Sequence, residues 1–156
     1  MLFRSENAHP TTSGGSLSVT EIVRAVMGVQ IGARYKFPFQ VKISVGDIGG
    51  PSAGMMFSLG IIDKLTKLDL TAGRFIAGTG EITASGQVQP IGGIQQKMTG
   101  ARNAGATIFL TPAANCADTK GAVPAGLRLV KVSTLNQAVT YLEALKSGHP
   151  DSVPSC

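Results

Sequence analysis

Apolar and polar positions alternate along the first third of the chain, and this pattern predicts two neighbouring β-strands. The apolar positions are Val29, Ile31 and Ala33 in the first stretch, and Phe39, Val41, Ile43 and Val45 in the second. Because successive side chains of a strand point to opposite faces, each stretch is expected to have one buried face.

A helical period begins after the glycine-rich stretch GGPSAGMM, residues 49–56. Apolar residues recur at positions 55, 59, 62 and 65, as expected for one buried face of a helix. Pro51 suits the first turn of this helix, because the missing N–H of proline would have no partner there. The sequence therefore predicts a helix that begins near Pro51 and ends near Lys67.

The rest of the chain alternates between helices and short strands, which indicates an α/β or α+β layered fold. The expected elements are a strand at 75–78, a hairpin with a Ser-Gly turn at 81–93, a helix at 93–103 closed by Gly105 as a left-handed cap, strands at 107–110 and 127–132 around a loop at 112–124, a helix at 134–145, and a polar tail at 147–156.

Composition supports one globular domain: of 156 residues, 43% are hydrophobic and 15% are charged. The net charge is +5, but basic residues are scattered singly, which argues against a nucleic-acid surface. No apolar run approaches the ~20 residues that span a bilayer. The pattern Gly-x-x-x-x-Gly-Lys-Ser/Thr is absent from the sequence, so it offers no P-loop for ATP hydrolysis.

Ser52 is the lone hydroxyl of GGPSAGMM, and it would lie in the first turn of the predicted helix. Backbone N–H groups there have no partner inside the helix, and the helix dipole would help them to stabilise a developing oxyanion. A serine at a helix start also commonly acts as a cap. The segment alone leaves both roles open.

A nucleophilic serine needs a base, and His9 near the start and His149 in the tail are poor candidates. A lysine can take this role when burial disfavours the charged amine. At 100° per residue, Lys97 falls in the apolar sector of helix 93–103. The alternative is a lysine that covers an apolar edge and keeps its ammonium in water.

Two stretches together resemble the proteolytic domain of Lon proteases: GGPSAG at 49–54 and GTGEITASGQVQPIGGIQQKMTGARNAGA at 78–106. The resemblance runs from about residue 28 to 145. It implies an α+β fold of the ribosomal-protein-S5 domain-2-like type and a Ser-Lys dyad. The implied activity is that of an ATP-independent serine endopeptidase, which needs no cofactor and acts on protein or peptide substrates rather than nucleic acid.

Carried over by position, the resemblance makes Ser52 the nucleophile and Lys97 the general base. Thr79 would help to hold the lysine amine, and the backbone N–H groups of Ser52, Gly50 and Gly49 would bind the oxyanion. Many Lon enzymes carry an acidic residue two positions before the proline, where this chain has Gly49. Any role of a carboxylate at that position is therefore in question.

The variant Ile-Gly-Gly-Pro-Ser-Ala-Gly is more similar to the YlbL-like proteins of Gram-positive bacteria, in which a membrane anchor and a PDZ domain precede a Lon-type domain. This similarity implies that residues 1–27 are the remnant of an upstream PDZ-like domain. Residues 28–146 would be the proteolytic domain and 147–156 a polar tail. The full-length protein would be membrane-anchored and extracytoplasmic, and assembly into a homo-oligomer is compatible with it.

The cysteine count alone allows two thiols or one disulfide. An extracytoplasmic location would favour a disulfide between Cys116 and Cys156.

Two other functions share these sequence features. A catalytically silent Lon-like assembly or binding module would have no reason to keep both Ser52 and an inward-facing Lys97. A phosphate-binding enzyme of the GHMP type also places a Gly/Ser-rich loop at a helix N-terminus. Its loop usually has more serines and glycines than GGPSAGMM offers.

Overall fold

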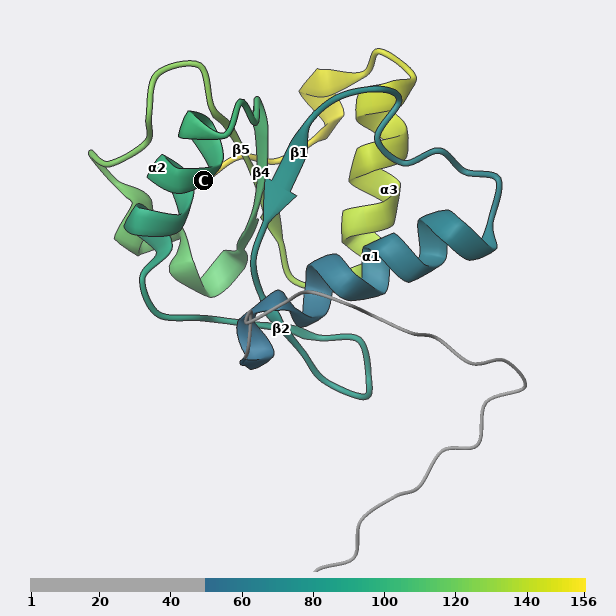
Figure 1. Ribbon diagram of the computed structural model, residues 1–156, viewed down its shortest axis with the longest axis horizontal. Helices are drawn as coiled ribbons and strands as arrows, with labels where there is room; N and C mark the ends of the chain where they lie inside the picture. The colour runs from purple at the N-terminus through teal and green to yellow at the C-terminus, as the bar shows by residue number, and fades with distance from the viewer. Residues whose placement is uncertain (1–49) are drawn as a thin grey trace, which may run out of the picture. The chain divides into compact units, whose positions relative to one another are not determined.

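Three parallel strands form the main sheet of the computed structural model, which describes residues 50–156 (Figure 1). The strand order is β1 (Ile76–Gly78), β4 (Ile108–Pro112) and β5 (Arg128–Val132), with β4 in the middle. A separate antiparallel hairpin pairs β2 (Glu81–Ile82) with β3 (Val88–Gln89). Strands of the main sheet are joined by helical crossovers, as parallel pairing requires.

Three α-helices and three short 3₁₀ turns complete the described chain: η1 (Pro51–Ala53), α1 (Gly54–Leu65), α2 (Ile94–Asn103), η2 (Ala113–Thr119), α3 (Leu135–Lys146) and η3 (Pro150–Ser152). The mixture of helices and strands confirms the expected α+β class. The strands predicted at 29–33 and 39–45, the remnant predicted at 1–27, and Gly49 all lie outside the described residues.

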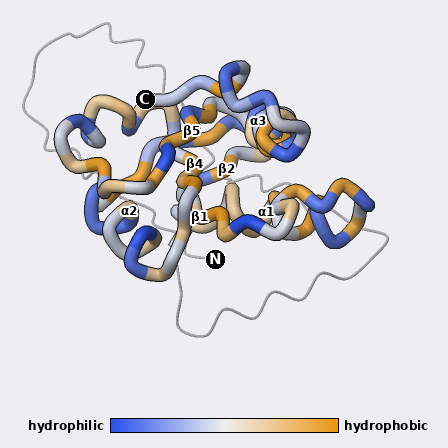
Figure 2. The backbone as a smooth tube through the Cα atoms, turned by 90° about the horizontal axis from the view of Figure 1, so that it is seen from above, coloured by the Kyte–Doolittle hydropathy of each residue, from blue (hydrophilic) through white to orange (hydrophobic). Residues whose placement is uncertain are grey.

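The central strand β4 is buried along its whole length, because both faces of the sheet are covered. Ile108 and Leu110 belong to a core cluster with side chains of α1 and α3, whereas Phe109 packs with Ile94 and Met98 of α2. Figure 1 shows α1 and α3 on one side of the sheet and α2 on the other. Figure 2 shows the apolar residues concentrated in these strands and on the helix faces toward them.

Two glycines occupy the turn and the helix cap that the sequence predicted. Gly86 has φ 79° in the turn of the β2–β3 hairpin, and its N–H donates to Thr83 O at 2.9 Å. Gly105 has φ 99° just after α2, and its N–H donates to Arg102 O at 2.9 Å. Both backbones lie in the left-handed region that favours glycine, so the predicted turn and cap are confirmed.

The segment predicted as a loop at 112–124 contains the 3₁₀ turn η2 over seven of its residues. Thr119 Oγ1 donates to Cys116 O at 2.8 Å within this turn, and both Asn115 and Thr119 are buried. A turn this short has too few residues to show an apolar period, so pattern analysis could not separate it from a loop.

The segment 147–156, expected to be a polar tail, packs back on the sheet. Val153 is only 5% exposed and belongs to the core on the α1 and α3 side. The N–H of Lys131 in β5 donates to Pro154 O at 2.9 Å, so the last residues lie along the outer edge of β5.

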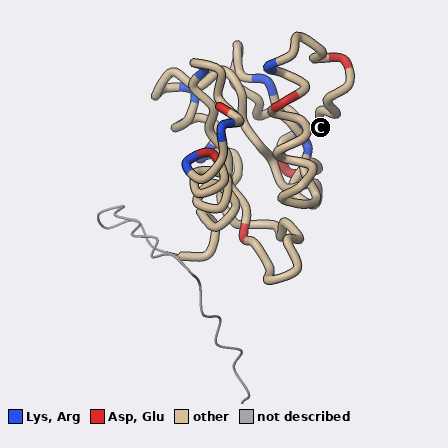
Figure 3. The backbone as a smooth tube through the Cα atoms, turned by 90° about the vertical axis from the view of Figure 1, so that its right-hand side faces the viewer, with Lys and Arg blue, Asp and Glu red and all other residues tan. Residues whose placement is uncertain are grey.

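Lys and Arg residues are spread over several elements, as Figure 3 shows, and match the scattered basic residues of the sequence. In the part of the chain that the structure describes, none of the helices is both long enough and apolar enough to cross a bilayer.

Candidate active site

Ser52 lies in the short turn η1, directly before α1. Pro51 occupies the first turn of η1, as the sequence predicted, and the chain enters through Gly50, whose φ is 95°. Gly50 and Ala53 are the cap residues of η1 and α1, and neither helix start has a side-chain cap. Within the described residues, the Ser52 hydroxyl therefore has no capping role. Its own N–H lies in a first turn, where N–H groups lack partners inside the helix.

The backbone of Ser52 is fixed from the side by the connection between β1 and β2. Ser52 O accepts the N–H of Gly80 at 2.8 Å, and Gly80 O in turn accepts the N–H of Met55 at 3.0 Å. A Cβ at position 80 would come within 2.7 Å of Val88 Cγ1, so only glycine fits between η1 and β3. The sequence motif contains Gly80, but the pattern gave it no role. The available signal was a glycine two residues after a short strand, where close approach of another segment is common.

Lys97 lies one turn into α2 and reaches across to η1. Its Nζ donates to Ser52 Oγ at 2.9 Å, which is within the range expected for a nucleophile and its base. The amine is thus directed to the serine rather than into bulk water, and the side chain is half-buried. Gly93, whose φ is 71°, caps the start of α2, and Lys97 N–H donates to Gly93 O at 3.1 Å.

Thr79 is the buried third member of the cluster, with 2% of its surface exposed. Its hydroxyl donates to Ser52 O at 2.8 Å and accepts from Lys97 Nζ at 3.4 Å. Its N–H donates to Leu110 O at 3.2 Å, which extends the pairing of β1 with β4. The structure therefore brings Ser52, Lys97 and Thr79 together from three separate segments: η1, α2 and the connection between β1 and β2.

A groove of about 360 Å³ opens beside these three polar side chains. Apart from them, small or apolar residues line it, among them Met56, Ala77, Gly78, Ala101 and Phe109. Apolar walls with a few converging polar groups are typical of binding pockets. Nowhere in residues 50–156 do three or more His, Cys, Asp or Glu side chains gather as a metal site would need.

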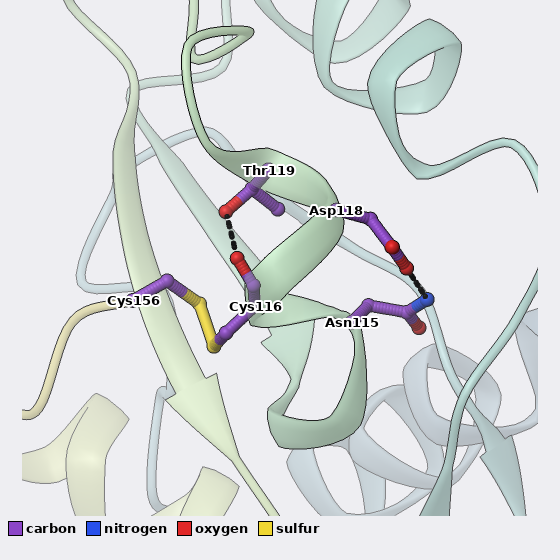
Figure 4. The surroundings of a disulfide bond; sticks show 5 residues. All are labelled: Asn115, Cys116, Asp118, Thr119 and Cys156. Carbon is purple, nitrogen blue, oxygen red and sulfur yellow. Dashed lines mark hydrogen bonds between the residues drawn. A yellow bond between two sulfur atoms is a disulfide. The ribbon is translucent and has the colours of Figure 1, made fainter.

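Cys116 and Cys156 are joined by a disulfide in the structure, across 40 positions of sequence (Figure 4). The bond ties η2 to the segment that follows α3. It lies on the far side of η2 from Asn115 in this view, outside the residues that line the groove.

A family model and several curated relatives all identify the same protein family for this chain. The family model of the Lon protease (S16) C-terminal proteolytic domain matches residues 18–145. Lon protease 1 of Sorangium cellulosum is 31% identical over 147 residues, which are 89% of this chain and 18% of that protein. The Lon protease of Heliobacterium modesticaldum is 38% identical over 109 residues, 67% of this chain and 13% of that protein. The Lon protease of Rickettsia bellii is 33% identical over 110 residues, which are 67% of this chain and 14% of that protein.

The chain thus spans less than a fifth of the length of these relatives, and the part it matches is the proteolytic one. The match covers the glycine-rich turn, the threonine segment and the lysine helix that meet in the structure. The chain belongs to the Lon protease (S16) C-terminal proteolytic domain family.

Proposed function

We propose that this chain is an ATP-independent serine endopeptidase that hydrolyses protein or peptide substrates with a Ser52–Lys97 dyad. The observation that carries the proposal is the 2.9 Å contact between Lys97 Nζ and Ser52 Oγ at the edge of an apolar groove. The same contact counts against a catalytically silent module, since such a module needs no lysine directed at a serine.

In the first chemical step, Lys97 with its amine neutral accepts the proton of Ser52 Oγ, which attacks the carbonyl carbon of the substrate. The resulting oxyanion is bound by the backbone N–H of Ser52 and by N–H groups of the preceding glycines, Gly50 and Gly49. When the C–N bond breaks, the Lys97 ammonium returns its proton to the leaving amine. Water then hydrolyses the acyl-enzyme, with Lys97 again as the base.

Thr79 supports this cycle without touching the substrate carbonyl. Because its own proton is donated to Ser52 O, its lone pairs remain free to accept from Lys97 Nζ. When the lone pair of the neutral amine faces the Ser52 hydroxyl, one N–H of Lys97 donates to Thr79 Oγ1 and the other is available to water or to the substrate.

The wider setting of the domain is also part of the proposal. The Ile-Gly-Gly-Pro-Ser-Ala-Gly segment supports the presence of an upstream PDZ domain and a membrane anchor in the full-length protein. With them the proteolytic domain would lie outside the cytoplasm. A homo-oligomer is compatible with this arrangement. The disulfide between Cys116 and Cys156 is compatible with that compartment.

The dyad is tested by cleavage of an unfolded, fluorescently labelled protein by the 156-residue chain. Ser52→Ala and Lys97→Ala should each abolish cleavage. Lys97→Arg should do so as well, because a guanidinium keeps its charge and cannot accept the proton. Far-UV circular dichroism checks that each variant stays folded.

Labelling by a serine-reactive fluorophosphonate tests nucleophile and base together. The label should be found on Ser52 in the wild-type chain and should be nearly lost in Lys97→Ala. Full cleavage activity in either alanine variant would rule out the dyad.

A further inference from the structure

Asn115 is a buried polar side chain outside the groove, 4% exposed and located in η2. Its Oδ1 accepts the N–H of Ile91 at 2.9 Å, and its Nδ2 donates to Ile91 O at 3.0 Å. One side-chain amide thus satisfies both backbone groups of Ile91, as a neighbouring strand would. No pattern in the sequence pointed to this residue, because its partner lies 24 positions away.

The clamped residue lies where the chain turns from the hairpin into the lysine helix. β3 ends at Gln89 and α2 begins at Ile94, so Ile91 sits in the short connection between them. Lys97 follows Ile94 by less than one helical turn. A shift or rotation of this connection therefore moves the start of α2, and with it the lysine amine that contacts Ser52.

η2 is held in place by bonds that do not involve Ile91. Asp118 Oδ2 accepts from Asn115 Nδ2 at 3.1 Å, and Thr119 Oγ1 donates to Cys116 O at 2.8 Å (Figure 4). Cys116 is covalently linked to the C-terminal segment by its disulfide. A second link to α2 comes from Gln95 Nε2, which donates to Asp118 O at 2.8 Å. η2 is thus a fixed support for the first turn of α2.

We propose that Asn115 is a positioning residue for the peptidase reaction: by holding the backbone of Ile91 it sets the start of α2 and thereby the contact of Lys97 with Ser52. The inference rests on the proposed function. Asn115 does not line the groove, so it acts through Lys97 and not on the substrate. Its loss leaves an N–H and a C=O of Ile91 unpaired in half-buried surroundings, which favours a relaxed connection.

The test compares Asn115→Ala with Thr119→Val in the full 156-residue chain. Both substitutions remove a buried hydrogen-bonding side chain of η2, but only the first releases Ile91. The rate of Ser52 modification by a small fluorophosphonate and the kcat for a peptide should fall roughly 10- to 100-fold in Asn115→Ala, because misplacing a catalytic group by about 1 Å costs this much. KM should stay close to the wild-type value. Thr119→Val should react like the wild type, because the disulfide and the two Asn115–Ile91 hydrogen bonds still hold η2 against the start of α2.

Hydrogen–deuterium exchange of residues 90–97 gives a readout that does not depend on catalysis. Exchange should accelerate in Asn115→Ala and remain unchanged in Thr119→Val. If Asn115→Ala does not fold, Asn115→Asp takes its place. This substitution keeps the size and the acceptor for Ile91 N–H but loses the donor to Ile91 O. The reaction rate should again fall, and the exchange of residues 90–97 should again accelerate.

Equal rates in Asn115→Ala and Thr119→Val would overturn the positioning role while leaving the dyad intact. If wild-type Ser52 does not react at all, the proposed function falls. The exchange comparison then still decides whether Asn115 holds the start of α2.

Discussion

The hydroxyl of Thr79 has two partners with different consequences for the site. It fixes the carbonyl of Ser52 by donating to it, and it receives the amine of Lys97 as an acceptor. Ser52, the proposed nucleophile, and Lys97, its proposed base, are therefore both held by one buried side chain. Thr79 would therefore position both members of the dyad without taking part in the chemical steps.

Replacing Thr79 by Val removes both contacts and nearly preserves the shape of the side chain. We expect kcat to fall by roughly 10- to 100-fold, because the lysine amine loses a hydrogen-bond acceptor and is less well positioned against Ser52 Oγ. The free energy of unfolding should fall by only about 1 kcal/mol, since Gly80 N–H still satisfies Ser52 O. Steady-state peptide hydrolysis and thermal melting measure the two effects.

Thr79→Ser is the matched control, because it keeps the hydroxyl and should recover most of the activity. An inactive Thr79→Ser with a wild-type melting temperature would contradict the role of the hydroxyl.

At this scale, the sequence predicted the candidate site residues from two signals. The projection of helix 93–103 placed Lys97 on the apolar side, and Pro51 placed Ser52 in a first turn; the structure shows both placements. Gly80 and Asn115 were missed, because their importance comes from contacts with distant segments: a side chain 8 positions along at Val88, and a backbone 24 positions back at Ile91.

At the scale of elements, the site depends on how closely η1 approaches the hairpin β2–β3. The N–H and C=O of Gly80 both bond to the chain around Ser52, and Val88 lies against the place where a side chain would start. Gly54 likewise faces Ile82, with a Cβ there coming within 3.0 Å of Ile82 Cγ2. Close contact of backbones is thus what sets the position of the serine.

Gly80→Ala should therefore damage activity and stability together. The added methyl group has to displace Val88, which is buried, and we expect the free energy of unfolding to fall by about 1–3 kcal/mol as in other overpacked cores. The same displacement moves Ser52 away from Lys97, so kcat should fall as well. Chemical denaturation and peptide hydrolysis at a temperature well below unfolding are the measurements.

Gly86→Ala offers a control in the same hairpin. Its backbone has φ 79°, so alanine there costs about 1–2 kcal/mol, but a Cβ meets only Leu135 Cβ at 4.0 Å. Stability should fall without a loss of kcat. The same loss of kcat in both variants would show that the approach of η1 to the hairpin is not what sets the serine.

Helices with a repeating apolar face were predicted well, whereas the short 3₁₀ turns were not. α1, α2 and α3 begin and end within about three residues of the predicted bounds, because each has an apolar face long enough to repeat. η2 and η3 were missed because each is too short to repeat an apolar face.

At the scale of the whole described molecule, the order of the strands could not be predicted from the sequence. The order β1-β4-β5 depends on which strands pair across the helical crossovers, and local patterns carry no information on that choice. The α+β class and the succession of elements could be predicted, since both follow from local periods. The resemblance added the meeting of Ser52 with Lys97, which lies 45 positions away.

The disulfide acts at this largest scale, because it closes a loop of 40 positions that contains β5 and α3. Removing it in a Cys116→Ala/Cys156→Ala double variant should lower the free energy of unfolding by about 4 kcal/mol, from the restored freedom of the unfolded chain. Dithiothreitol should lower the melting temperature of the wild-type chain but not that of the double variant. Two reactive thiols in the native, unreduced protein would contradict the bond.

The covalent loop also decides what happens when the chain is cut. The segment 120–126 between η2 and β5 is largely exposed, and it lies inside the loop closed by Cys116 and Cys156. A nick there, by a neighbouring copy or by another peptidase, separates β5 and α3 from the rest of the sequence but not from the molecule. The clipped protein keeps both halves joined until its disulfide is reduced, so a single cut is not enough to release the strand and helix that complete its core.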